Sequence, residues 1–424
     1  MSDLHDLCHF TERPITKSYI TTLRQYLKLG IPLTYTVEEA YNYTKGIETD
    51  PTSTTTPLHL VCRHYPEDAT DDEIKIVEEF VSVLLEYGAG WCLVDDKGDT
   101  PGCTLVKREL RNSPIYRQIV ESGVRAELLL RKVEEYQVEF IEEDQIESQT
   151  NETQPEEPEE HIETEAKDQE ASTSKYSEKP DAACDQQTYL STKLEYTDDA
   201  LLTKDAKDGV MMDWETDLMH LGAQSLFKGG KLLDSESELD SEINVLNIGF
   251  GMGIIDTKIQ ELAAQSPSTV THYICEAHPD VLLKMRKDGW YDKPNVVVLE
   301  GRWQDQLDDI LQKGGVFFNG IYYDTFSEHY EDMLELFDYV VGLLKPHGVF
   351  SFFNGLGADR WVVYDVYRKL VELDLSNYGL SCVYTDVNIP NHTKKEDGSV
   401  WDDVKRSYFE CPVYYHPEIR FIDI

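Results

Sequence analysis

The feature that most constrains this chain is an apolar segment that breaks into closely spaced glycines. Residues 245–253 read VLNIGFGMG, and a second apolar segment, THYIC, is followed by Glu276. Glycines after a strand let the backbone pass close to a ligand, and an acid at the end of the next strand can bind a ribose hydroxyl. Gly249, Gly251 and Gly253 form G-x-G-x-G, whereas the dinucleotide fingerprint is G-x-G-x-x-G. The spacing favours S-adenosylmethionine over NAD, and a glycine-rich turn without a ligand is the alternative.

Strand and helix patterns continue to alternate after this segment. An apolar strand at residues 296–299 leads into GRWQ, and another, GIYYD, ends at Asp324. A helix that ends at Lys345 is followed by a Pro-His-Gly turn and a further strand. This alternation predicts an α/β domain with a parallel sheet and helices on both faces. Ligands on such sheets bind beyond the carboxyl ends of the strands, where four candidate residues fall: Gly249, Glu276, Trp303 and Asp324.

Length and charge limit the classes to which the chain can belong. At 424 residues it exceeds one ordinary core, so we expect two domains and a linker. A net charge of −42 disfavours nucleic acid as a direct partner and favours a basic protein. The eight cysteines form no C-x-x-C pair, and the chain shows neither a signal-peptide pattern nor an apolar run of membrane length. We therefore expect reduced thiols, no metal, no membrane contact, and a soluble protein of the cytoplasm and nucleus.

Residues 134–187 have the composition of a flexible acidic linker. Between Glu134 and Glu170 there are sixteen Asp or Glu residues and one Lys. Such a segment buries too little apolar area to offset the entropy lost on ordering. A solvated spacer and a segment that recruits a basic substrate both fit this composition.

Residues 1–133 are similar to ankyrin repeats. TPLHLVCRH begins at Thr56, and a second copy, TPGCTLV, begins at Thr100, 44 residues later. The ankyrin period is about 33 residues, and the insertion PEDATDDE accounts for the excess. In the second copy Gly102 and Cys103 replace the usual Leu and His, which weakens the repeat. We predict an all-α domain completed by flanking helices, which serves either protein docking or a structural role.

A family resemblance combines these motifs with one more. Ahead of the first strand, residues 209–219 read GVMMDWETDLM. Together, VMMDWET, VLNIGFGMG, YICEAHPD, GRWQ and IYYDTFSEHY resemble guanidinoacetate N-methyltransferase. With its ankyrin-like N-terminus, the whole chain resembles the fungal type IV protein arginine methyltransferases. The resemblance implies a Rossmann-like S-adenosylmethionine-dependent methyltransferase fold at residues 188–424, with a mostly parallel sheet and a late antiparallel strand. It also implies methylation of the internal δ-nitrogen of arginine in a large-subunit ribosomal protein.

The resemblance also implies a set of cofactor contacts. Residues 250–255 match the contacts to the methionine end of S-adenosylmethionine, residues 276–278 those to its ribose, and residues 303–304 those on the adenine side. Either Tyr189 or Tyr196 closes over the cofactor, and the spacing does not decide between them. The implied cofactor-binding residues are Tyr189, Tyr196, Met219, Gly249, Phe250, Gly251, Met252, Gly253, Ile254, Ile255, Glu276, Ala277, His278, Trp303, Gln304 and Asp324.

Glu215 and Asp324 match the paired catalytic acids of the resembling family. A guanidinium is planar and permanently charged, so two converging carboxylates orient it through charge-assisted hydrogen bonds. We hypothesise that carboxylates on the terminal nitrogens leave the δ-nitrogen the better nucleophile. Methyl transfer needs alignment more than acid–base power, and it needs no metal. Helix capping is the alternative role of both residues.

Other interpretations fit parts of the chain. The substrate could be a small guanidino compound, or the protein could be an ankyrin-type adaptor with a vestigial nucleotide fold. The acids of residues 327–335 have the spacing of a solvated helix face, and the aromatics of residues 406–417 are typical of core in a late strand. We expect a monomer or a weak dimer.

Overall fold

The computed structural model describes residues 3–28, 30, 32–47, 54–135, 181–229, 241–389 and 399–422. Most of the predicted acidic linker, residues 136–180, lies outside this range. Met1–Val124 and Asp181–Ile424 form one compact unit, and Arg125–Pro180 form a second. None of the described helices combines the length and apolar character needed to cross a bilayer.

The regular secondary structure among the described residues of the N-terminal region consists of helices joined by turns and loops. Threonines before the helices supply caps: Thr36 and Thr70 form capping boxes with Glu39 and Glu73. Helices are therefore present in this region, and the all-α domain of ankyrin-like repeats stays a prediction. The helices are α1 (Asp3–Leu7), α2 (Lys17–Leu27), α3 (Val37–Lys45), α4 (Pro57–His64), α5 (Asp71–Glu86), α6 (Pro101–Lys107) and α7 (Pro114–Glu135).

The C-terminal region contains the predicted sheet. Its strands are β4 (Glu242–Ile248), β5 (Thr269–Glu276), β6 (Val296–Glu300), β7 (Phe318–Tyr323), β8 (Leu344–Phe352), β9 (Leu380–Asn388) and β10 (Val413–Phe421). They lie in the order β6-β5-β4-β7-β8-β10-β9. The pairs among the first five of these positions are parallel, whereas β10 runs antiparallel to both β8 and β9. This confirms the Rossmann-like prediction, and it puts the reversal of strand order at β4, where such sheets bind ligands.

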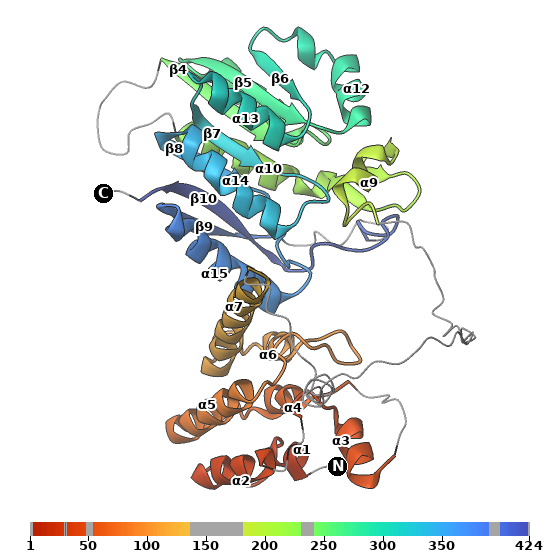
Figure 1. Cartoon of the computed structure of the whole chain (residues 1–424), viewed down its shortest axis with the longest axis vertical. Coiled ribbons are helices and arrows are strands. Elements are labelled where there is room, and N and C mark those ends of the chain that lie inside the picture. The colour runs from red at the N-terminus through yellow and green to blue at the C-terminus, as the bar shows by residue number, and fades with distance from the viewer. Residues whose placement is uncertain are drawn as a thin grey trace, which may run out of the picture. The chain divides into compact units, whose positions relative to one another are not determined.

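Helices cover both faces of this sheet. The first, short elements are α9 (Gln186–Ser191), a small sheet of β1 (Leu194–Tyr196), β2 (Ala200–Thr203) and β3 (Gly209–Met212), and the 3-10 turn η1 (Asp213–Glu215). The longer helices are α10 (Thr216–Lys228), α11 (Ile254–Gln265), α12 (Pro279–Lys287), α13 (Trp303–Lys313), α14 (Tyr330–Leu343) and α15 (Trp361–Asn377). Helices α13 and α14 share one core with the sheet, and α10 and α11 share another (Figure 1). The sheet is therefore buried on both faces, as its continuous apolar strands predict.

Two predicted boundaries were wrong. The late strand begins at Val413 rather than at Arg406, because residues 406–412 form a loop. Helix α14 ends at Leu343, and Lys345 already lies in β8. Neither change moves a strand out of the sheet.

Close packing joins α6 and α7 to α15 within the first compact unit. A Cβ atom on Gly102 would lie 2.6 Å from Val362, and one on Gly123 would lie 2.6 Å from Val366. Arg111, in the turn between α6 and α7, makes a bidentate ion pair with Asp365 at 2.7 and 3.1 Å. The departure from the ankyrin pattern at Gly102 therefore has a steric reason, because Leu would not fit against α15.

Candidate active site

The glycine segment ends β4 with a sharp change of backbone direction. Gly249, Gly251 and Gly253 have φ values of 92°, 54° and 74°, in a region that residues other than glycine rarely adopt. A Cβ atom on Gly249 would lie 1.8 Å from the carbonyl oxygen of Asp324. Glycine at position 249 therefore allows the carboxyl ends of β4 and β7 to approach each other.

Glu276 lies at the end of β5 and connects two backbone segments. One oxygen accepts a hydrogen bond from the amide of Phe250 at 2.9 Å, and the other accepts from the amides of Ala277 at 2.8 Å and His278 at 2.6 Å. Burial raises the pKa of this carboxyl, whereas the backbone hydrogen bonds lower it. These bonds hold Glu276 at the edge of a cavity.

A cavity of about 560 Å³ opens at the carboxyl ends of β4, β5 and β7. Seven of the sixteen predicted cofactor-binding residues line it: Tyr189, Gly249, Gly251, Glu276, Ala277, Trp303 and Asp324. Its other lining residues include Gln186, Leu190, Met211, Arg302, Phe326 and Glu328. Gln186 and Leu190 lie on α9, outside every motif. The other four lie within the motifs quoted above, but the sequence assigned none of them to the cofactor.

The remaining predicted cofactor residues lie outside the lining of this cavity. They are Tyr196, Met219, Phe250, Met252, Gly253, Ile254, Ile255, His278 and Gln304. Met219, Phe250 and Ile255 are core side chains, with at most 2% of their surface exposed. His278 caps α12, and its Nε2 lies 3.1 Å from the carbonyl oxygen of Tyr189.

The structure distinguishes the two candidate tyrosines. The ring of Tyr189 lies between those of His278 and Phe326, at centroid distances of 4.8 and 4.9 Å, and it lines the cavity. The hydroxyl of Tyr196 instead donates to the carbonyl oxygen of Gly251 at 3.0 Å, behind the glycine segment. Of the two side chains, Tyr189 is the one in place to cover a cofactor.

A second cavity, of about 1130 Å³, contains both predicted catalytic acids. Glu215 and Asp324 line it, and Asp324 also lines the first cavity. Val210, Thr325, Phe326 and Glu328 are likewise common to both. The two cavities therefore meet at Asp324, which is the arrangement that a reaction between two bound molecules requires.

The two acids lie without a cation, Glu215 buried and Asp324 half-buried. Only 3% of the surface of Glu215 is exposed, and the Oδ2 atom of Asp324 is buried without a hydrogen bond. Burial and the charge of Asp324 raise the pKa of Glu215 well above its ordinary value. Burial and the charge of Asp256 raise the pKa of Asp324 to about 7. Neither carboxylate has an ion pair with any Lys, Arg or His in the described ranges, so the pair is placed to receive a cation.

Two residues of the second cavity lay outside the sequence-based site. Glu328 was predicted on a solvated helix face, but it precedes α14 and accepts hydrogen bonds from Tyr323 and Thr325 at 2.6 Å and from Trp303 at 3.0 Å. The hydroxyl of Tyr408 donates to Glu215. Tyr408 belongs to the aromatics interpreted as core, and its partner is distant in sequence, so no local signal could identify it.

No group of three or more His, Cys, Asp or Glu side chains among the described residues could hold a metal ion.

Comparisons with known proteins agree with this geometry. The guanidinoacetate N-methyltransferase family model matches residues 180–362. A protein arginine N-methyltransferase 2 from Debaryomyces hansenii is 59% identical over 100% of both chains. The protein of the same name from Saccharomyces cerevisiae is 50% identical over 99% of this chain and 100% of its own. Among solved structures, an O-methyltransferase from Streptomyces achromogenes in complex with SAM covers 50% of this chain and 82% of its own, at 15% identity and a TM-score of 0.32, a likeness too weak to add to these matches.

Proposed function

Because this chain belongs to the protein arginine N-methyltransferase 2 family, and is therefore a methyltransferase, we propose that it methylates the internal δ-nitrogen of an arginine in a protein substrate. The methyl donor in this proposal is S-adenosylmethionine. One observation carries the proposal. Glu215 is buried, Asp324 has a buried oxygen without a hydrogen bond, and both line one cavity that meets the other at Asp324.

The first cavity fits the cofactor. Gly249 leaves no room for a side chain where the backbone must approach the ligand, and Glu276 stands at the strand end where a ribose hydroxyl would be bound. Trp303, at the start of α13, and Tyr189, on α9, both line this cavity and would contact the bound cofactor. When bound, S-adenosylmethionine supplies an electrophilic methyl group.

The second cavity fits a guanidinium. A cation between Glu215 and Asp324 would favour the charged form of both carboxyls and offset the cost of burying them. Planar N–H donors would fix the arginine in one orientation through charge-assisted hydrogen bonds. With the terminal nitrogens held by carboxylates, the δ-nitrogen is the one left to face the first cavity.

The protein substrate in this proposal is basic, and we name a large-subunit ribosomal protein, as the family resemblance implies. The net charge of −42 supports a basic partner through long-range attraction.

The test is to incubate the protein with methyl-labelled S-adenosylmethionine and a ribosomal extract, and to identify the methylarginine isomer by fragmentation mass spectrometry. We expect δ-methylarginine in a ribosomal protein. Methylation of a terminal nitrogen would contradict the proposed orientation of the guanidinium.

The match to the guanidinoacetate N-methyltransferase model supports a second candidate, a small guanidino substrate. Methylation of guanidinoacetate by the purified protein, with no label in any protein of the extract, would favour it.

A further inference from the structure

We infer that Tyr408 is a positioning residue whose hydroxyl holds the Glu215 carboxylate in the orientation that binds the substrate guanidinium. This inference rests on the proposed function, since it concerns the same carboxylate pair. It assigns a role to the loop of residues 399–412, which lies outside the segment that the guanidinoacetate N-methyltransferase model matches.

The contact between the two side chains is direct. The Tyr408 hydroxyl donates to Oε1 of Glu215, and both residues line the second cavity. Glu215 ends the short turn η1 and makes no side-chain cap of α10, so its carboxylate is not needed to start that helix. One carboxylate oxygen is therefore held by Tyr408.

Neighbouring groups hold the Tyr408 ring. Its centroid lies 4.8 Å from the Trp401 ring at a steep interplanar angle of 75°, and 6.2 Å from the Trp214 ring. A Cβ atom on Gly209 would lie 3.1 Å from the Tyr408 ring, so the backbone of β3 also contacts it closely. Because the ring is packed on several sides, the position of the Tyr408 hydroxyl is fixed within narrow limits.

Polar contacts hold the backbone of the same loop. The amide of Lys405 donates to the carbonyl oxygen of Lys207 at 2.8 Å. The Lys405 ammonium lies 2.8 Å from Asp181 and 3.4 Å from Asp208. The loop is thus anchored beside β2 and β3, three residues before Tyr408.

A tyrosine suits this position because its hydroxyl is a neutral donor. An arginine or lysine there would neutralise Glu215 and compete with the substrate. A hydroxyl instead stabilises the carboxylate while leaving its charge available. Burial raises the pKa of Tyr408 well above its ordinary value, so the hydroxyl keeps its proton at neutral pH.

The titratable groups around Glu215 come from several elements. Asp324 follows β7 and raises the pKa of Glu215, whereas the Tyr408 hydrogen bond lowers it. Tyr322 on β7 and Tyr414 on β10 also face this carboxylate, and both keep their protons because burial raises their pKa. Tyr408 is therefore the neighbour whose removal should shift the titration of Glu215 to higher pH.

The test is Tyr408→Phe, which removes the hydroxyl and keeps the ring. We expect kcat/KM for the arginine substrate to fall about tenfold, the cost of one hydrogen bond to a charged group. The acid limb of the pH profile should move to higher pH, and the Kd for S-adenosylmethionine should stay unchanged. Tyr384→Phe, which removes a buried hydroxyl on β9 outside both cavities, is the matched control.

A double variant separates positioning from a merely structural role. If Tyr408 acts through Glu215, adding Tyr408→Phe to Glu215→Gln should produce little further loss. The inference would be overturned if the losses of kcat/KM in the two single variants add up in the double variant. It would also be overturned if the acid limb of the pH profile does not move in Tyr408→Phe.

A binding experiment distinguishes this inference from the proposed function. Methylguanidine is titrated calorimetrically into the protein with bound S-adenosylhomocysteine. If the wild-type protein methylates no arginine but binds methylguanidine, the proposed function fails; weaker binding by Tyr408→Phe then supports the role of Tyr408, and equal binding overturns it. Absence of methylguanidine binding by the wild-type protein would overturn both.

Discussion

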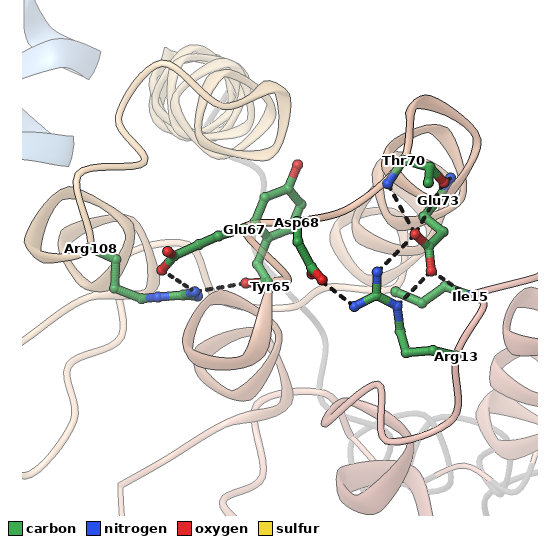
Figure 2. A network of polar contacts seen from close by, with 8 residues as sticks. All are labelled: Arg13, Ile15, Tyr65, Glu67, Asp68, Thr70, Glu73 and Arg108. Carbon is green, nitrogen blue, oxygen red and sulfur yellow. Dashed lines mark hydrogen bonds and ion pairs between the residues drawn. The ribbon is translucent and has the colours of Figure 1, made fainter.

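Two buried carboxylate sites in this protein differ in the source of their cation. In the N-terminal helices, Glu73 accepts from Nε and Nη2 of Arg13 at 2.6 and 2.9 Å, and from the amides of Ile15 and Thr70 at 3.0 Å (Figure 2). These bonds, led by that with Arg13, hold the pKa of Glu73 well below its usual range. In the second cavity, burial and neighbouring charge raise the pKa of Glu215 and of Asp324.

The difference shows what a carboxylate needs when it leaves water. At Glu73 the fold itself supplies a guanidinium, and Arg111 does the same for Asp365. Among the described residues, the Tyr408 hydroxyl and the backbone of Met212 bond to Glu215, and one oxygen of Asp324 has no hydrogen bond. A guanidinium from a substrate would make the second site resemble the first, and this is the physical basis for the proposed specificity.

The largest expected effect comes from Asp324→Asn. Methyl transfer to the arginine substrate should fall on the order of 100-fold or more, because a buried charged partner of the guanidinium is lost. The melting temperature of the free protein at pH 8 should rise, because a buried charge without a cation is removed. Asp338→Asn on the exposed face of α14 is the control, and unchanged turnover in Asp324→Asn would remove this acid from the mechanism.

The second prediction concerns pH. Guanidinium binding needs the charged carboxylates, and the pKa of Asp324 lies at about 7, so kcat/KM should rise as the pH increases through neutrality. Because this pKa exceeds its ordinary value of 3.8, the stability of the free protein should fall as the pH rises from about 4 to about 7 and then level off. At Glu73 the pKa is lowered, so the ionised carboxylate stabilises the fold at neutral pH. This stabilisation is lost only when acid protonates Glu73. If kcat/KM does not change between pH 6 and 8, the pKa of Asp324 is not raised as proposed, and the two sites do not differ in this respect.

A third prediction removes a guanidinium that the fold supplies. Arg111→Met should destabilise the protein by about 2–4 kcal/mol, since it leaves Asp365 buried without its cation. Adding Asp365→Asn should recover part of the loss. Denaturant unfolding measures both changes, and equal losses in the single and double variants would show that the ion pair is not the cause.

The smallest effect is expected at the first site of the comparison. Glu73→Gln should lower the melting temperature by several degrees, because Gln provides only one acceptor for Arg13 and two backbone amides. Methyl transfer per folded molecule should stay within about twofold of wild type, since Glu73 lines neither cavity and shares no contact with the acid pair. A large loss of turnover in a folded variant would instead tie this site to catalysis.

Much of the site could be predicted because its signals are local. Gly249, Glu276 and Asp324 each follow an apolar strand directly, and parallel strands bring their carboxyl ends to one edge of the sheet. Glu328 and Tyr408 could not be predicted in the same way. Their partners come from segments that only folding brings close, and their own sequence surroundings are typical of a helix face and of core.

The sequence by itself determined the alternation of strands and helices, the position of the glycine segment and the excess of acidic residues. These depend on the residue type and its near neighbours, which act before any tertiary contact forms. Only the tertiary structure decided which acids lack a cation, since a carboxylate in the sequence looks the same whether or not a guanidinium reaches it. It also decided the meaning of Gly102, which weakens a repeat in the sequence but allows α6 to pack against Val362 of α15 in the fold.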